Sequence, residues 1–293
     1  MAVWLEHKER GSSPLMRFVA WLSLTVGRRA GRALLYPICC YFILSSPKAR
    51  NASRRYLNRV LRDGASLKDV FRHYHAFSAT ILDRVFFLTG KFGQYRISLI
   101  GEEAVARSLA AKRGCILLGA HIGSFEVVRS LGIEREKLPL KILMYRDNSR
   151  RINAIVDMLN PEVTKSIIYL GKPQSMLAVK EWLDLGGMIG ILGDRITHGD
   201  KTVSAPFLGE VARWPIGPYV LAQRLKAPIV LFVGLYRGAN RYEIHFEEFA
   251  APERPENVTS LAQRYARRLE HYCRVAPLNW FNFYDFWNGA HDR

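Results

Sequence analysis

His121 and Glu126 are the two residues whose types and spacing most directly suggest chemistry. They bracket the segment His-Ile-Gly-Ser-Phe-Glu, which follows an apolar run at residues 115–120. In one continuous helix, a separation of five residues turns the chain by roughly 140°, so the two side chains would lie on different faces. A strand that ends before the histidine, a bend at Gly123 and a helix that begins near Ser124 would bring them together. We therefore expect a strand–bend–helix unit here.

An imidazole bonded to a carboxylate through one ring nitrogen can act as a general base through the other. We expect Glu126 to fix the tautomer of His121, which leaves the second nitrogen free to take a proton from a hydroxyl. In the first turn of a helix, the carboxylate would also be favoured by the helix dipole. By itself this spacing favours a structural histidine. The position directly after a Gly-flanked apolar run favours the catalytic interpretation.

Apolar runs and amphipathic stretches alternate along the rest of the chain. Runs typical of buried strands lie at residues 115–120, 140–145, 188–192 and 229–235. Stretches typical of helices lie at residues 69–88, 124–131, 152–159, 173–185, 216–225 and 260–274. This alternation predicts an α/β fold with a mostly parallel sheet and helices on both faces. Ligands of such sheets bind at the carboxyl ends of the strands, where His121 and the Gly193-Asp194-Arg195 turn both fall.

The N-terminal segment has two apolar stretches, residues 18–26 and 33–44, with arginines between them. Neither reaches the roughly 18 apolar residues of a clear membrane-spanning helix. Arginine and aromatic side chains beside them suit helices that lie in or dip into the cytoplasmic leaflet of a bilayer. Two ordinary core helices are the alternative. We divide the chain into an N-terminal membrane-associated helical segment, residues 1–60, and an α/β catalytic domain, residues 61–293.

The composition points to an anionic partner. The 293 residues include 43 basic and 26 acidic side chains, which gives a formal charge of +17, and 49% are hydrophobic. That apolar fraction excludes a disordered chain. The charge is compatible with nucleic acid, anionic lipid or an acidic carrier protein, and also with a solvated basic surface that has no specific partner. Each basic residue close to an anionic leaflet contributes about 1 kcal/mol to membrane binding. The N-terminal segment has several such candidates: Arg28, Arg29, Arg32, Lys48, Arg50, Arg54 and Arg55.

The cysteines and histidines indicate neither disulfides nor a metal site. The four cysteines form no CxxC pair, so we expect them to be reduced, in a domain on the cytoplasmic side. Cys115 lies inside an expected strand, where core packing explains it better than nucleophilic catalysis. His73 and His75 are two residues apart on an expected helix and face different ways. The other histidines show no ligand spacing, so we expect no metal.

The segment Gly119-Ala120-His121-Ile122-Gly123-Ser124-Phe125-Glu126 resembles the HX4(D/E) block of the late acyltransferases of lipid A biosynthesis. The resemblance covers roughly residues 101 to 249, and further blocks of that family follow in order. Met144-Tyr145-Arg146 with Asn148 resembles its Tyr-Arg-…-Asn segment, and Gly193-Asp194-Arg195 stands where the family has an Asp-Gln-type turn. Ala205 to Gly209 resembles its Pro-Phe-Phe-Gly block, and Ala212 to Gly217 its Ala-x-Thr-Pro-x-Gly block. A membrane-anchoring N-terminal segment is also a family feature. Within the family, the chain most resembles acyltransferases found with aryl-polyene or xanthomonadin-type pigment synthesis.

The resemblance implies transfer of an acyl group from a thioester, on acyl carrier protein or CoA, to a hydroxyl of a lipid or glycolipid. It implies no cofactor, and it places the enzyme at the cytoplasmic face of a bacterial inner membrane. His121 would be the base. Arg146 would stabilise the developing oxyanion or grip a phosphate, although a surface salt bridge is the alternative. Asp194 and Arg195 would position the acceptor or stabilise their turn, and Arg213 would bind a phosphate or the prosthetic arm of the carrier.

The chain also departs from the family pattern. Arg195 replaces the usual Gln, and Trp214 stands where Thr is common. These differences affect the expected identity of the acceptor more than the expected type of reaction. The aromatic tail at residues 280–287 suits the bilayer interface, closure over an acyl tunnel, or burial against the core.

Two other functions remain open. The same base would also serve a hydrolase that cleaves a lipid ester or thioester with water. The charge alone would permit a basic non-enzymatic nucleic-acid-binding protein. However, the sequence has no nucleic-acid-binding motif, and its aromatic residues cluster near the C-terminus instead of interleaving with the basic ones.

Overall fold

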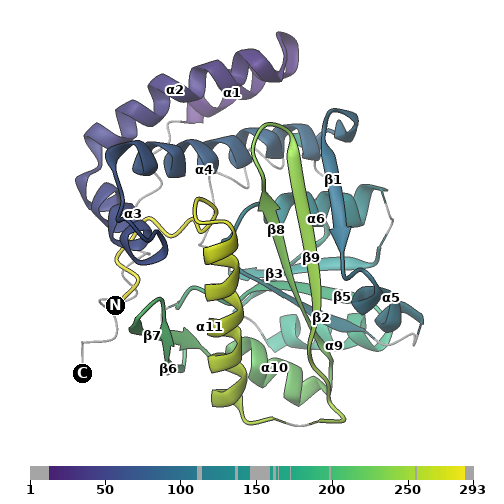
Figure 1. The fold of residues 1–293 in the computed structure, drawn as a ribbon. Helices are drawn as coiled ribbons and strands as arrows, with labels where there is room; N and C mark the ends of the chain where they lie inside the picture. Colours follow the sequence, from purple (N-terminus) through teal and green to yellow (C-terminus); the bar gives the residue numbers. More distant parts are fainter. Residues whose placement is uncertain are drawn as a thin grey trace.

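A seven-stranded sheet forms the centre of the molecule (Figure 1). The computed structural model describes residues 13–110, 114–135, 138–145, 159–160, 163, 165–171, 173–197, 199–254 and 256–287. The strand order is β1-β9-β8-β2-β5-β3-β4. Adjacent strands are parallel except for β8 and β9. The strands are β1 (Arg96–Ile100), β2 (Cys115–Gly119), β3 (Leu140–Tyr145), β4 (Ile167–Leu170), β5 (Met188–Leu192), β8 (Ile229–Tyr236) and β9 (Arg241–Ala250).

The buried strands are those that the sequence predicted. Every residue of β2 and of β8 is buried, because a strand covered on both faces must be apolar throughout. The runs expected at residues 140–145 and 188–192 are β3 and β5. The edge strand β1 is mostly exposed, and β9 alternates buried and charged side chains, so neither forms a continuous apolar run.

Helices cover both faces of the sheet. They are α4 (Leu67–Leu88), α5 (Glu103–Ala110), α6 (Phe125–Ser130), α9 (Pro173–Asp184), α10 (Gly217–Leu225) and α11 (Val258–Val275), with a short 3-10 helix, η1 (Phe92–Gln94), and a π-helical turn, η2 (Leu131–Arg135). Successive residues of β2 point to opposite faces. Leu117 packs into the core that α4 and α6 cover, and Leu118 into the core that α10 and α11 cover. The expected α/β fold with a mostly parallel sheet is therefore confirmed. The helix expected at residues 152–159 lies outside the described residues, apart from Leu159.

A two-stranded hairpin projects from this domain and packs against α11. It consists of β6 (Thr202–Phe207) and β7 (Glu210–Pro215), paired antiparallel. Leu208 and Gly209 turn the chain with positive φ angles of 50° and 84°. Phe207 and Trp214 are fully buried. Trp214, the residue that departs from the family pattern, is thus part of the aromatic core beneath the hairpin.

The three N-terminal helices are α1 (Ser13–Thr25), α2 (Arg28–Ser45) and α3 (Pro47–Val60). The first two lie side by side across α4, on its side away from the sheet (Figure 1). Within the described part of the chain, no helix has both the length and the apolar character needed to cross a bilayer. Large hydrophobic side chains are nevertheless exposed on α1, on α2 and between them: Phe18, Trp21, Val26, Tyr36, Tyr41 and Leu44. The proposed boundary at residue 60 stays a prediction.

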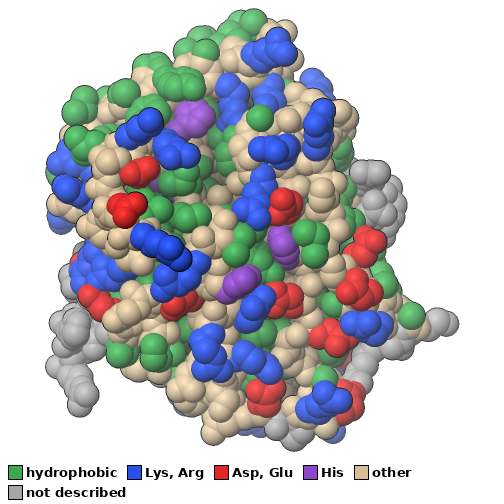
Figure 2. Space-filling view, in the orientation of Figure 1, with side chains coloured by type: hydrophobic (Ala, Val, Ile, Leu, Met, Phe, Trp, Pro, Cys, Tyr) green, Lys and Arg blue, Asp and Glu red, His purple; other side chains and the backbone are tan. Residues whose placement is uncertain are grey.

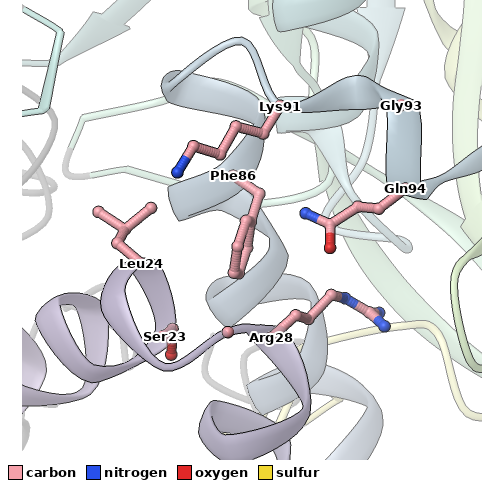
Figure 3. A pocket seen from close by; sticks show the side chains of 8 residues that line it. Ser23, Leu24, Arg28, Phe86, Lys91, Gly93 and Gln94 are labelled. Atoms are coloured by element: carbon pink, nitrogen blue, oxygen red, sulfur yellow. The ribbon is translucent and has the colours of Figure 1, made fainter.

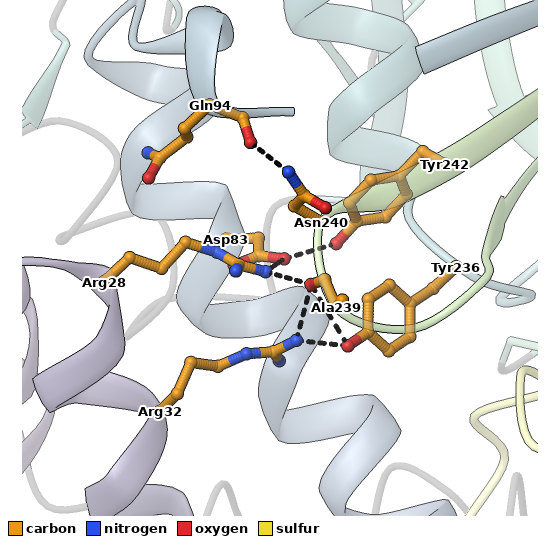
Figure 4. A network of polar contacts seen from close by, with 8 residues as sticks. All are labelled: Arg28, Arg32, Asp83, Gln94, Tyr236, Ala239, Asn240 and Tyr242. Carbon is orange, nitrogen blue, oxygen red and sulfur yellow. Dashed lines mark hydrogen bonds and ion pairs between the residues drawn. The ribbon is translucent and has the colours of Figure 1, made fainter. Parts of the chain in front are cut away.

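Two of the arginines that we expected to face a bilayer point into the protein instead (Figure 4). Arg28 donates two hydrogen bonds to the buried carboxylate of Asp83, at 2.7 and 2.9 Å, and Tyr242 donates a third at 2.8 Å. Arg32 donates to the Tyr236 hydroxyl and, at 2.8 Å, to the carbonyl of Ala239. These contacts fasten α2 to α4 and to the β8–β9 turn. They form because the buried Asp83 carboxylate of α4 and the acceptors at the β8–β9 turn lie within reach of the α2 guanidinium groups.

Candidate active site

The segment that carries His121 folds as a strand, a bend and a helix. Gly123 has a φ of +63°, and a Cβ at this position would clash with the carbonyl oxygen of Gly234. Only glycine meets both conditions without strain. The backbone N–H of Ser124 donates to the same carbonyl at 2.7 Å. The Ser124 hydroxyl caps α6 by accepting from the N–H of Val127. The predicted bend and helix start are thus confirmed.

The parallel pairing of β2 with β5 brings Asp194 to His121. Gly119 and Leu192 are opposite each other in the ladder, so the residues two positions further along each strand are also neighbours. The Nδ1 of His121 lies 2.7 Å from Oδ1 of Asp194, and the backbone N–H of His121 donates to Oδ2 at 3.1 Å. The carboxyl ends of adjacent parallel strands therefore form the centre of the site, as the fold predicts.

The structure corrects the role that we expected for Glu126. Its Oε1 accepts hydrogen bonds from Arg129 and, at 2.9 Å, from Ser130, and its Oε2 lies 3.4 Å from Nε of Arg84 on α4. Asp194, and not Glu126, holds the imidazole. The reason is geometric: the first turn of α6 directs Glu126 into the interface with α4, whereas the adjacent strand delivers Asp194 directly to the ring.

The Asp194 carboxylate is fully buried and accepts four hydrogen bonds from three of the described residues. Besides the two donors of His121, Oδ2 accepts from the indole N–H of Trp280 at 3.2 Å and from the amide of Asn282 at 3.0 Å. Burial alone would raise the pKa of Asp194, but the adjacent imidazole, Arg195 and the Asn282 hydrogen bond lower it well below its ordinary value. The carboxylate is thus ionised at neutral pH. It can only accept, so Nδ1 of His121 carries the proton.

The other ring nitrogen of His121 is left for chemistry. The side chain is 29% exposed, and no described residue is hydrogen-bonded to Nε2. Burial lowers the pKa of His121 below its ordinary value, and the positive charge of Arg195 lowers it further, against the opposing effect of Asp194. A neutral imidazole with Nδ1 protonated presents an acceptor lone pair at Nε2. This is the state that a general base requires.

A family model described as bacterial lipid A biosynthesis acyltransferase matches residues 72–288. The chain belongs to this family. Among solved structures, it is similar to the crystal structure of the 1-acyl-sn-glycerophosphate (LPA) acyltransferase from Thermotoga maritima, at 13% identity and a TM-score of 0.40, over 83% of this chain and 98% of that one. The comparison with curated proteins found no match.

In this member of the lipid A acyltransferase family, the predicted substrate-binding residues make different contacts. Asp194 is occupied with the imidazole. Arg195 donates to the Asn282 side chain at 2.8 Å and to the Phe281 carbonyl at 3.0 Å, so it fastens the C-terminal tail beside the site. Arg213 lies on β7 and donates to the Thr202 hydroxyl across the hairpin. Arg146 lies outside the described residues.

The aromatic tail, residues 280–287, lies beside Asp194, and the sequence left its role open. In the structure the tail is buried against the core. Trp280 and Trp287 are buried, and Trp280 donates a hydrogen bond to Asp194. His73 on α4 holds the tail in place, because its Nε2–H donates to the Trp280 carbonyl at 2.9 Å while its Nδ1 accepts from Ser53 at 2.8 Å. The high aromatic content marked the tail as unusual, but no local pattern linked it to Asp194.

A separate hollow of about 410 Å³ lies at the α1–α2 bend (Figure 3). Its lining includes the side chains of Leu24, Arg28, Phe86, Lys91 and Gln94. None of the predicted site residues that the structure describes lines it. The hollow therefore belongs to the junction of the N-terminal helices with the end of α4, and not to the His121 site.

Proposed function

We propose that this protein transfers a fatty acyl group from a thioester donor to a hydroxyl of a lipid or glycolipid. The observation that carries the proposal is the His121–Asp194 pair, in which Nε2 of the imidazole has no hydrogen bond to any described residue. Membership of the lipid A acyltransferase family supports the reaction class. The chemistry requires no covalent acyl-enzyme, since the acceptor hydroxyl is itself the nucleophile.

The proposed reaction has two steps. The acceptor oxygen attacks the thioester carbonyl carbon while its proton passes to Nε2 of His121, and the carbonyl oxygen becomes an oxyanion. The C–S bond then breaks, the carbonyl re-forms, and the imidazolium returns its proton to the leaving thiolate. The products are an ester and a free thiol. A positioned base of this kind contributes on the order of 10²–10⁴ in rate, and Asp194 stabilises the imidazolium that forms between the steps.

We further propose that the N-terminal helices rest on the cytoplasmic face of a bacterial inner membrane. Hydrophobic side chains gather along the edge of the molecule formed by α1 and α2, with Lys and Arg side chains beside them (Figure 2). With Arg28 and Arg32 turned inward, the exposed basic residues of this segment include Arg29, Lys48 and Arg54. Aromatic and apolar groups with basic neighbours suit interfacial binding to anionic lipid.

The donor that we favour is an acyl carrier protein. Such carriers are acidic, and the formal charge of +17 on this chain would draw an acidic partner to it. Acyl-CoA also carries negative phosphates and is the alternative donor. Comparing initial rates with the same acyl chain on the two donors, at low and at high salt, decides between them.

The test is acyl transfer in a defined mixture. The full chain is incubated with a fatty acyl carrier thioester, with or without vesicles of a total bacterial lipid extract, and mass spectrometry identifies any acylated lipid. We expect ester formation that depends on the vesicles and is lost in His121→Ala. Release of free fatty acid at the same rate without any acceptor would identify the protein as a thioester hydrolase instead.

A further inference from the structure

Three charged side chains lie together between α4 and α6, beside the turn that carries His121. Arg84 comes from α4, and Glu126 and Arg129 come from α6. The exposed fractions of these side chains are 24% for Arg84, 5% for Glu126 and 4% for Arg129. Two guanidinium groups therefore share one carboxylate, which leaves a net positive charge in a largely buried place.

The hydrogen bonds of this cluster are incomplete. Glu126 binds Arg129 and Ser130 through Oε1, and Arg84 approaches Oε2 only to 3.4 Å at Nε. Nε of Arg84 and Nη1 of Arg129 are buried, and neither has a hydrogen-bond partner in the described part of the chain. Buried cationic donors without acceptors are costly. Such groups are found where a protein keeps a site ready for a ligand.

Arg84 is the member of the cluster with the most accessible side chain. It is the most exposed of the three, and its charge acts on the catalytic ring: burial lowers the pKa of His121 most, and the charges of Arg195 and Arg84 lower it further. Arg129 donates to the same carboxylate and takes part of the charge of Glu126, so Glu126 cannot neutralise Arg84 fully. The partially unsatisfied guanidinium is thus held within electrostatic reach of the base.

We propose that Arg84 binds the carbonyl oxygen of the thioester beside His121, and that Glu126 and Arg129 position it. This rests on the proposed function. During attack by the acceptor hydroxyl, that oxygen becomes an anion, and a preorganised cation at this point stabilises it. Glu126 then acts on catalysis through Arg84, and not through the imidazole.

The test compares Arg84→Gln, Arg84→Lys and Arg84→Met with the wild type, with the acyl carrier thioester and lipid vesicles described above. Arg72→Gln is the matched control, because Arg72 lies on the same helix, is exposed and pairs with Asp69 one turn away. We expect Arg84→Gln to lower kcat by ~10²–10³ with little change in KM, as for loss of one oxyanion donor. Arg84→Lys should recover part of the loss, and Arg72→Gln should be unaffected.

The role of Glu126 has its own measurement. If Glu126 works through Arg84, the double variant Arg84→Gln, Glu126→Gln loses no more activity than Arg84→Gln alone. Multiplied losses would show that Glu126 acts independently and would overturn its positioning role.

Each other outcome has a defined meaning. Wild-type kinetics in a folded Arg84→Gln or Arg84→Met protein overturn the proposal, and so does failure of both variants to fold, because the cluster is then structural. A raised KM with unchanged kcat assigns Arg84 to a phosphate that the donor or acceptor already carries, and overturns the carbonyl assignment. If His121→Ala and Asp194→Asn lose activity and Arg84→Gln does not, the acyltransferase proposal stands and this inference fails. If none loses activity, the acyltransferase mechanism itself is wrong.

Discussion

The Asp194 carboxylate is bonded to His121 twice, by the ring at 2.7 Å and by the backbone N–H at 3.1 Å. The first contact fixes the tautomer, and the second fixes where the backbone of the histidine sits relative to the carboxylate. A buried carboxylate that orients a histidine base in this way is the arrangement found in hydrolytic triads, where it stabilises the imidazolium without taking its proton. Here the acceptor hydroxyl would take the place of the nucleophilic serine.

Replacement of Asp194 by Asn should lower acyl transfer by roughly 10²–10⁴ while the protein stays folded. The amide keeps the shape of the side chain but loses the charge that stabilises the imidazolium. Initial rates and thermal unfolding measure the two effects separately. Asp200→Asn is the control, since Asp200 accepts from Thr197 in the same loop after β5. Equal losses in both variants would contradict a specific role for Asp194.

The pH dependence of kcat/KM should show one acid limb that belongs to His121. The base must be neutral, and burial, Arg195 and Arg84 place its pKa below the ordinary value of 6.5, against the opposing effect of Asp194. Activity should therefore rise with pH below 6.5 and level off by neutrality. Arg195→Gln, which installs the usual residue of the family, removes a positive charge and should move the limb to higher pH. Arg213→Gln should leave it in place.

Stability should fall between pH 6.5 and 4 because His73 stays neutral in the folded protein. Burial lowers the pKa of His73 to about 4. Below 6.5 the unfolded chain takes up a proton that the folded chain excludes, so the free energy of unfolding should drop by roughly 2–3 kcal/mol at pH 4.5 from this group alone. The lowered pKa of His121 acts in the same direction. Denaturant unfolding at pH 7 and 4.5 measures the change.

His73→Gln supplies the check on that assignment. It should flatten this pH dependence, whereas the exposed His271→Gln on α11 should not. A wild-type slope in His73→Gln would show that other groups control acid stability.

Gly123→Ala should be strongly destabilising. The alanine must adopt a φ of +63° and place its Cβ against the Gly234 carbonyl. We expect a loss of about 3 kcal/mol or more, from strain and overlap together. Gly209→Ala separates the two causes, because Gly209 has a φ of +84° with no atom within 4 Å of a Cβ, and its cost should be roughly 1–2 kcal/mol. Similar melting temperatures for the two variants would contradict the close approach.

Vesicle flotation tests the membrane proposal. Binding should be stronger to anionic than to zwitterionic vesicles, and Trp21→Ser should weaken it about tenfold by removing apolar contact area. Leu185→Ser is matched to it, since Leu185 is 80% exposed but follows α9 and lies outside the N-terminal helices. Unchanged binding of Trp21→Ser would argue against contact through α1.

Local features of the site followed from the sequence. The apolar runs that became β2, β3, β5 and β8 predicted the parallel sheet, because buried strands must be apolar along their whole length. The bend at Gly123 and the cap at Ser124 were also predictable, since each depends on the conformational preference of one residue. Strands β1, β4 and β9 escaped prediction. β1 and β9 mix charged and apolar side chains, and β4 has only four residues.

Tertiary structure alone decided the partner of His121. Glu126 lies five residues away along the chain and Asp194 seventy-three, yet the ladder between β2 and β5 places the distant carboxylate on the ring. The same holds for Arg28. Its sequence context predicted contact with anionic lipid, but the fold places the Asp83 carboxylate beside it. Sequence specifies which side chains can ionise and which segments must be buried. Which charges meet depends on strand order and helix packing, because these bring distant segments together in space.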